Sequence, residues 1–342
     1  ADLEIVFSGY SSGNMVWALN PDGSDVSGFP IDLGEKVKTG VALADFNGNG
    51  RDDIVVGTFS ENLYLFYDDG TVAPGFPYQV GDDIVAAPVI LDLDGQKRIF
   101  FGCRDDNFYA VNDDGSLHFS HTASDEILTS PALLEYENNF YVFFSDDSGI
   151  LYAVDTEGNT LPGWPIDIGE SLGQSMVFSD LDGNGLAEVI AVTAMSNVFA
   201  FNLDGSLHDG FPLNSGSPNF SAPMIIDLDE DGDVEILIGS AGNLVAFDIK
   251  SSGSSHSYWS MYRGNEQRTG YYDIEGGGSE CGVALGDVSG DGMINILDLV
   301  QVVNYILDVS TPSYECAADF TEDGVVNILD LVQIANFILA SP

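Results

Sequence analysis

The sequence predicts a mainly β protein, a six-bladed β-propeller followed by a small helical module at the C-terminus. Three observations predict it. A strand-like segment recurs at intervals of 42 to 49 residues, a second strand ending in an acidic residue and glycine follows most copies, and two near-identical segments close the chain. Four short antiparallel strands in each repeat of about 45 residues are typical of a propeller blade.

The recurring strand occupies residues 4–9, 53–58, 98–103, 140–145, 188–193 and 235–240. Six copies indicate six blades, and a seventh is possible only if further chain precedes Ala1. A Gly-Phe-Pro or Gly-Trp-Pro signature follows four of the second strands, which suits an outer strand because proline lacks an N–H to donate. A further strand precedes five of the six copies, so the first blade lacks one. We expect the aromatic segment 256–272 to close the ring; a removed N-terminal part is the alternative.

Three of the five junctions that lead into a recurring strand carry oxygen-bearing side chains at positions 1, 3, 5 and 9, with a backbone carbonyl at position 7. The expected ligands are Asp45, Asn47, Asn49, the Arg51 carbonyl and Asp53; Asp180, Asp182, Asn184, the Leu186 carbonyl and Glu188; and Asp227, Asp229, Asp231, the Asp233 carbonyl and Glu235. Calcium accepts six to eight oxygens in flexible geometry, whereas magnesium needs a strict octahedron. Ordinary Asx-Gly turns are the alternative, and three recurrences at one phase of the repeat favour calcium.

The other two junctions depart from this spacing. Residues 92–95 form a shortened loop, and residues 134–137 contain no glycine. We expect these two blades to pair without a metal. The calcium ions would then stabilise particular blades and take no part in chemistry.

With these loops, residues 1 to about 275 resemble the FG-GAP family of integrin-α-like propeller repeats. The resemblance implies structural calcium at the rim of the blades. It also implies a role in adhesion, in carbohydrate binding or as an appendage of a secreted enzyme. We place the propeller at residues 1–273 and a glycine-rich linker at 274–280.

The module at 281–342 contains two calcium loops of EF-hand spacing, each followed by a helix of about a dozen residues. The expected ligands are Asp287, Ser289, Asp291, the Met293 carbonyl, Asn295 and Asp298 in the first copy, and Asp319, Thr321, Asp323, the Val325 carbonyl, Asn327 and Asp330 in the second. With the three propeller loops, the chain would hold about five Ca²⁺ ions. Cys281 and Cys316 each precede a loop and could form a disulfide; Cys103 lies in an apolar run and is expected to be a buried thiol.

Residues 282–340 resemble a type I dockerin, which implies attachment to a cohesin module on a scaffold or cell surface. The recognition positions that the resemblance implies are Ile296 and Leu297 in one copy and Ile328 and Leu329 in the other. Because the copies are nearly interchangeable, either could face a partner. The alternative is that these apolar pairs pack between the two helices.

Nine basic residues against 55 acidic ones exclude binding to nucleic acid or to an anionic membrane surface, because nothing would neutralise the phosphates. No apolar stretch reaches 18 residues, and no catalytic motif is found; His118 and His208 share one repeat position, which points to a turn role. The sequence favours a secreted, non-catalytic binding or adhesion protein whose propeller takes a glycan or protein ligand. A polysaccharide lyase or hydrolase, or a C-terminal accessory part of a larger secreted enzyme such as a protease, is the alternative.

Overall fold

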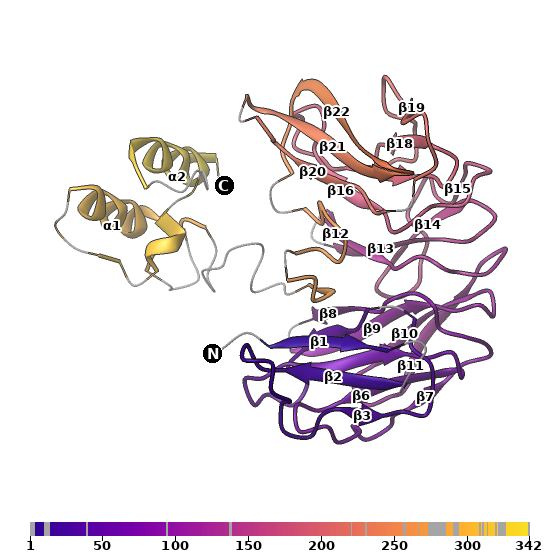
Figure 1. The fold of residues 1–342 in the computed structure, drawn as a ribbon. Coiled ribbons are helices and arrows are strands. Elements are labelled where there is room, and N and C mark those ends of the chain that lie inside the picture. Colours follow the sequence, from indigo (N-terminus) through magenta and orange to yellow (C-terminus); the bar gives the residue numbers. More distant parts are fainter. Residues whose placement is uncertain are drawn as a thin grey trace. The chain divides into compact units, whose positions relative to one another are not determined.

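The computed structural model divides the chain into two compact units, Ala1–Tyr272 and Asp273–Pro342 (Figure 1). It describes residues 4–9, 14–38, 40–93, 95–136, 139–219, 221–229, 231–255, 258–265, 267–272, 285–289, 294–307, 309, 311–312, 314–318, 320 and 326–340. Within these residues, no helix combines the length and the apolar character needed to cross a membrane.

The first unit contains six sheets in which successive strands pair antiparallel. The first three are β1 (Ile5–Ser8), β2 (Met15–Leu19) and β3 (Ile31–Asp32); β4 (Ala42–Ala44), β5 (Asp53–Gly57), β6 (Asn62–Phe66) and β7 (Tyr78–Gln79); and β8 (Val89–Leu93), β9 (Gln96–Gly102), β10 (Asn107–Asn112) and β11 (Leu117–Thr122). The next three are β12 (Ala132–Tyr136), β13 (Asn139–Ser145), β14 (Ile150–Asp155) and β15 (Ile166–Asp167); β16 (Val177–Ser179), β17 (Glu188–Val192), β18 (Asn197–Phe201) and β19 (Leu213–Asn214); and β20 (Met224–Ile226), β21 (Asp233–Ser240) and β22 (Asn243–Ser252).

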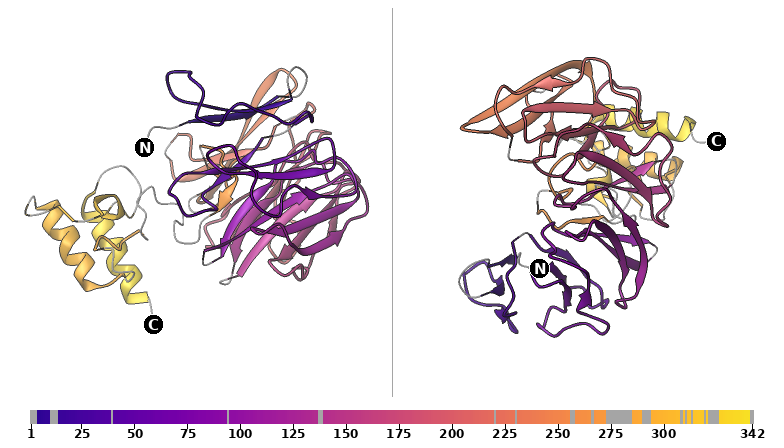
Figure 2. Two further views of the ribbon diagram at one scale, coloured as in Figure 1. Left: turned by 90° about the horizontal axis from the view of Figure 1, so that it is seen from below. Right: turned by 90° about the vertical axis from the view of Figure 1, so that its right-hand side faces the viewer.

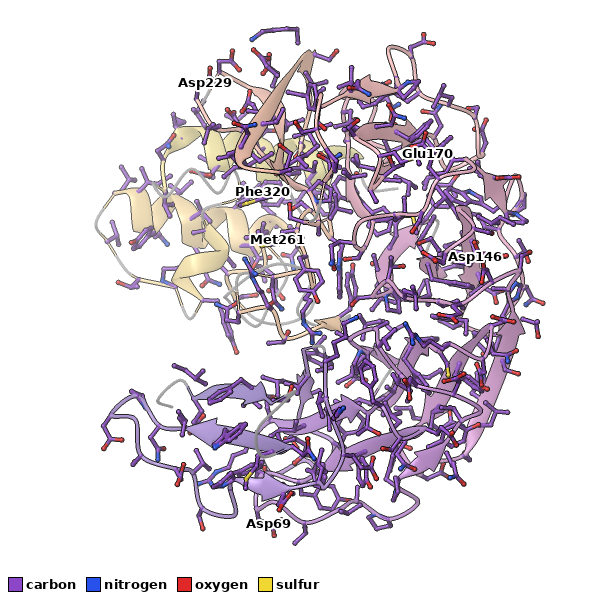
Figure 3. All side chains as sticks on the ribbon, turned by 45° about the vertical axis from the view of Figure 1, so that its right-hand side comes forward. Asp69, Asp146, Glu170, Asp229, Met261 and Phe320 are labelled. Atoms are coloured by element: carbon purple, nitrogen blue, oxygen red, sulfur yellow. The ribbon has the colours of Figure 1, made fainter. Side chains whose placement is uncertain are left out.

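Glycines allow neighbouring sheets to interlock at their turns. A Cβ atom on Gly28 would lie only 2.0 Å from the carbonyl oxygen of Asp69. Asp69 lies in the turn after β6 and is labelled in Figure 3. A Cβ atom added to Gly75 would lie 1.9 Å from the carbonyl oxygen of Asp114, and one added to Gly163 would lie 1.9 Å from that of Asp204. In three of the four signatures the glycine is therefore needed for close packing as well as for its positive φ, whereas a Cβ atom on Gly210, in the fourth, would meet no atom within 4 Å.

Aromatic and branched side chains fill the space between the sheets. Phe108 of the third sheet stacks on Phe144 of the fourth with ring centroids 4.0 Å apart. Trp164 and Trp259 are buried, and Trp164 Nε1 donates to the carbonyl of Leu203 at 3.0 Å. These two tryptophans are core residues, so they offer no surface on which a sugar could stack.

The segment 258–272 bonds to the inner strands of four different sheets. Its carbonyls at 259, 260, 269 and 270 accept backbone hydrogen bonds from Phe178, Ile225, Leu43 and Ile90, and β23 (Tyr271–Tyr272) pairs in parallel with β8. Our expectation that this segment closes the ring by completing the first sheet is wrong for the described residues. Apart from β23 itself, the first strand of each of these sheets lies at the edge of its sheet and has backbone N–H groups without a partner in that sheet. Carbonyls of the segment accept one hydrogen bond from such a strand in each of the four sheets. Across the described residues, no strand pairing joins the first sheet to the sixth.

The second unit is a pair of helices, α1 (Ile296–Ile306) and α2 (Ile328–Ala340), with a short 3₁₀ helix at Glu315–Ala318 (Figure 2). Asn295 caps α1: its side chain accepts from the Leu297 N–H, and the Asp298 carboxylate accepts from the Asn295 N–H. The small core includes Val288, Val302, Ala317, Ala318 and Ile334.

Candidate metal centres

The carboxylate of the first residue of the 45–53 loop accepts hydrogen bonds from the backbone N–H groups of the turn. Asp45 Oδ1 accepts from Gly48 N at 2.7 Å, and Oδ2 accepts from Gly50 N at 2.7 Å. Partial burial acts to raise the pKa of Asp45, but these backbone donors together hold it below its usual range. In the second loop Asp180 makes the matching bonds to Gly183 and Gly185 at 2.7 and 2.8 Å. The two loops therefore share one fold.

The carboxylates at the ninth position are all buried. Asp53, Glu188 and Glu235 each accept from the backbone N–H that follows the first loop residue, at 2.8, 2.7 and 2.6 Å. Burial raises the pKa of Asp53 to about 6. Burial and the nearby charges of Asp182 and Asp180 raise the pKa of Glu188 to about 7. Buried carboxylates held close to other carboxylates are stabilised by a bound cation, so these residues fit calcium.

The third loop has unsatisfied oxygens. Asp227 Oδ1 and Asp233 Oδ1 are buried and have no hydrogen-bond partner among the described residues. Ligand atoms of Asp227, Asp229 and Glu235 lie within 4.8 Å of one another. Asp233 was expected to offer only its carbonyl, but its side chain also lies within 4.8 Å of Glu235 and Asp248. This loop, too, fits a cation that is held by oxygens.

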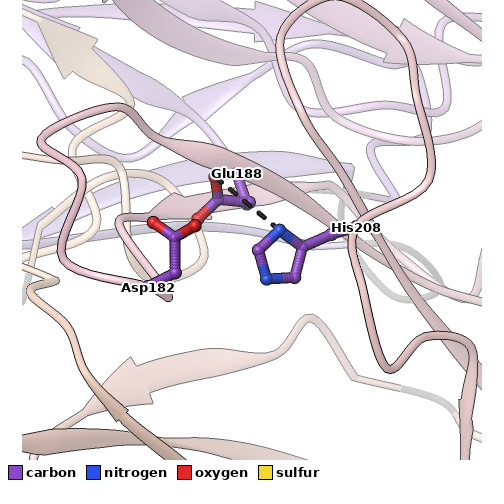
Figure 4. A group of neighbouring side chains, drawn as sticks. All are labelled: Asp182, Glu188 and His208. Atoms are coloured by element: carbon purple, nitrogen blue, oxygen red, sulfur yellow. Dashed lines mark ion pairs between the residues drawn. The ribbon is translucent and has the colours of Figure 1, made fainter.

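The second loop includes a residue that the sequence did not assign to it. Ligand atoms of Asp182, Glu188 and His208 lie within 4.8 Å of one another (Figure 4). We interpreted His208 from its repeat position as a turn residue. It reaches the loop because the turn after β18 lies beside the start of β17, a proximity that spacing along the chain does not reveal.

At the third sheet a lysine lies where the other loops would hold a metal. Lys97 Nζ is 2.7 Å from Asp92 Oδ2, and Asp92 Oδ1 accepts from Gly95 N at 2.7 Å, as Asp45 and Asp180 do in their loops. At the fourth junction, residues 137 and 138 lie outside the described part of the chain.

In the second unit the described loop residues come together at the start of each helix. Asp298 Oδ1 accepts from Ser289 N at 3.0 Å, and Ser289 Oγ donates to Asp287 Oδ1 at 3.2 Å. Asp287, Asp298 and Asp330 are buried. The remaining expected ligands, Asp291, Met293, Asp319, Thr321, Asp323 and Val325, lie outside the described residues, as do Cys281 and the Cys316 side chain.

The apolar pairs at the start of the helices face solvent. Ile296 and Leu297 are 67% and 60% exposed, and Ile328 and Leu329 are 66% and 60% exposed. The alternative, that they pack between the helices, is wrong. Val300 and Val332, one turn further along, are also half exposed. Each helix therefore presents the same apolar stripe.

Residues 285–339 match the family model of the dockerin type I domain. Dockerin domains bind calcium and bind cohesin modules, and the match supports both for this dockerin domain. The expected calcium chemistry and the expected class of partner are therefore supported at the C-terminus.

Comparisons with whole proteins inform the fold alone. No curated protein matches the chain. A crystal structure of BBS1N in complex with ARL6DN, soaked with lead, is 14% identical with a TM-score of 0.50, covering 72% of this chain and 74% of that chain. A structure of BamB from Moraxella catarrhalis is 15% identical with a TM-score of 0.45, covering 71% and 78%.

Proposed function

We propose that this chain is a secreted, calcium-stabilised binding protein that is anchored to a scaffold or cell surface through its dockerin domain. The observation that carries the proposal is the repeated, exposed apolar stripe on α1 and α2, within a domain that matches the dockerin type I model. Exposed aliphatic pairs on a chain of net charge −46 indicate a docking surface for another protein.

We propose that residues 1–273 form a six-bladed propeller of FG-GAP-like repeats and that residues 281–342 form the anchor. Six sequence repeats, six sheets and the interlocked glycine turns support this assignment. Three Ca²⁺ ions in the propeller and two in the anchor would make the total of five. The propeller would then present the ligand-binding surface, for a glycan or a protein.

A binding role is favoured over catalysis by how the acidic side chains are used. The most strongly buried acids of the oxygen-rich loops, Asp53 and Glu188, each accept a hydrogen bond from a backbone N–H of their own loop. These bonds hold turns together. A general acid–base pair would instead face a substrate cleft.

Capture of a cohesin tests the anchoring function. The full chain is passed over a panel of immobilised type I cohesin modules in millimolar Ca²⁺, and again in EDTA. We expect calcium-dependent capture by at least one module. Asp287→Ala together with Asp319→Ala should abolish capture and leave the tryptophan fluorescence of the propeller unchanged. Capture that persists in EDTA or in this variant would refute the proposal.

A further inference from the structure

The connection between the first two strands of the third sheet is shorter than its counterpart in the second sheet. Residues 45–52 connect β4 to β5, whereas only residues 94–95 connect β8 to β9. In the second sheet this loop covers the turn after β6: Asn49 Nδ2 donates to Asp68 Oδ1 at 2.8 Å, and the Asp68 side chain is 19% exposed. Asp113 holds the place of Asp68, one residue before an Asp-Gly pair, and it is exposed. The shorter connection therefore leaves the turn after β10 uncovered.

A cavity of about 370 Å³ lies beside this turn. Its volume is in the lower part of the ~300–1,000 Å³ range of ligand sites, so it has room for a small molecule or for one unit of a polymer. Residues of β9, β10, β11 and the turn after β10 line it, among them Gln96, Arg98, Asn112, Asp113, Asp114 and His118. A polar cavity thus takes the place of the loop.

A guanidinium stands in this cavity where the second sheet has a carboxylate. Arg98 is the first residue of its copy of the recurring strand, as Asp53 is in the second sheet. Its Nη1 donates to the Thr156 carbonyl at 2.6 Å and lies 3.6 Å from Glu157 Oε1. His118 Nε2 lies 3.2 Å from the other oxygen of Glu157. Because a guanidinium has no lone pair to offer a metal, this position does not repeat the cation site of the second sheet.

The lining places hydrogen-bond donors beside acceptors. Gln96 and Asp113 are exposed, so an amide and a carboxylate are both accessible to a ligand. Lys97 also lines the cavity, but its ammonium group is paired with Asp92 at 2.7 Å. A sugar hydroxyl both donates and accepts hydrogen bonds, like the hydroxyl groups of proteins. Neighbouring hydroxyls of one sugar ring would therefore suit a lining of this kind.

Charge decides which class of sugar the cavity fits. The basic groups that line it already have acidic neighbours, and a chain of net charge −46 repels anionic ligands. We propose that this cavity binds one neutral sugar unit of a glycan. The inference rests on the proposed function in one respect, that the propeller presents a ligand-binding surface, and it names the ligand class and the place.

The expected affinity is low. Among the described residues that line the cavity, none is Phe, Tyr or Trp, so hydrogen bonds and not ring stacking hold the sugar. Each hydrogen bond replaces one made to water and contributes little net free energy. We expect a Kd of about 0.1–1 mM for a single site.

The experiment titrates the full chain, loaded with Ca²⁺, with hexasaccharides of glucose, xylose, mannose and galactose. Calorimetry measures the affinity, and saturation-transfer NMR identifies the sugar protons in contact with the protein. We expect at least one hexasaccharide to bind with one-to-one stoichiometry. Asp113→Ala should lower its affinity about tenfold, the loss typical of one hydrogen bond to a charged group, and Gln96→Ala should lower it severalfold. The matched control is Asp68→Ala, which should bind sugar as the parent chain does because its loop fills the equivalent space.

Binding of none of the four hexasaccharides would overturn the inference. So would unchanged affinity in both Asp113→Ala and Gln96→Ala, or an equal loss in Asp68→Ala. A hexamer of galacturonic acid is the charge control, and preference for it over every neutral sugar would refute the neutral class. The anchoring function fails separately: a chain that binds sugar but no cohesin refutes the anchoring alone, and a chain that binds cohesin but no sugar refutes this inference alone.

Discussion

Lys97 Nζ lies 2.7 Å from Asp92 Oδ2, with both side chains largely buried. Asp92 stands where Asp45, Asp180 and Asp227 begin the oxygen-rich loops, and Lys97 supplies a positive charge there. In the third sheet the ammonium group of Lys97 therefore supplies the positive charge beside the first carboxylate of the loop. Lys97 also lies over the Tyr271 ring, 5.9 Å from its centroid, which connects it to β23.

Lys97→Met should destabilise the first unit by about 1–3 kcal/mol, because Asp92 would be left as a buried charge without its partner. Urea unfolding followed by tryptophan fluorescence measures this, since all three tryptophans lie in the first unit. The matched control is Arg51→Met. Arg51 pairs with Asp68 at 3.4 Å but is 76% exposed, so its loss should cost under about 1 kcal/mol. Similar costs for the two variants would contradict the role given to Lys97.

Removing calcium should lower the stability of both units and unfold the dockerin domain first. At 100 times its dissociation constant, one bound ion contributes about 2.7 kcal/mol, and the small core of the dockerin domain has little else to compensate for the loss. Circular dichroism at 222 nm reports the helices, and tryptophan fluorescence reports the first unit. Melting curves that do not change on addition of EDTA would show that the loops hold no structural ion.

Changing one apolar pair should leave cohesin capture nearly intact, whereas changing both should abolish it. Each exposed aliphatic side chain contributes about 1.5 kcal/mol or more when buried in an interface, and either helix offers one pair. The variants are Ile296→Ser with Leu297→Ser, the equivalent change at 328 and 329, and their combination. Val309→Ser is the control, because this residue is as exposed but lies beyond the end of α1. Capture by the combined variant would show that the stripes are not the docking surface.

Cys103 should resist thiol reagents in the native chain. It is a free, fully buried cysteine whose Sγ donates to the carbonyl of Asp82 at 3.2 Å, and burial raises its pKa from 9.0 to about 12. The folded state holds this proton between these pH values while the unfolded state releases it, so stability falls as the pH rises above about 9. Cys103→Ser should remove that part of the pH dependence. Labelling is measured in a variant with serine at 281 and 316, and rapid labelling at pH 8 would contradict the burial.

Much of the local structure is predictable from the sequence because it depends on short spacings. The repeat interval located every strand of the recurring type, and the loop spacing located Asp45, Asp53 and Glu188 at their turns. His208 was missed because its relation to Glu188 arises across a hairpin, and no local pattern distinguishes it from His118. The sequence predicted that the segment 258–272 completes the first sheet, but it bonds to strands of four other sheets. Apolar composition indicates that a segment is buried, but it does not indicate which strands lie beside it.

By itself, the sequence determined the repeat, the alternation of strands and turns, the oxygen-rich loops and the dockerin spacing. Each of these is set by backbone preferences and side-chain chemistry over a few neighbouring residues. Only the tertiary structure decided that Lys97 neutralises Asp92, that His208 joins Asp182 and Glu188, and that the apolar pairs of α1 and α2 remain exposed. Charge pairing, the proximity of acidic and histidine side chains, and exposure depend on distances between residues far apart in the chain, and folding alone sets those distances.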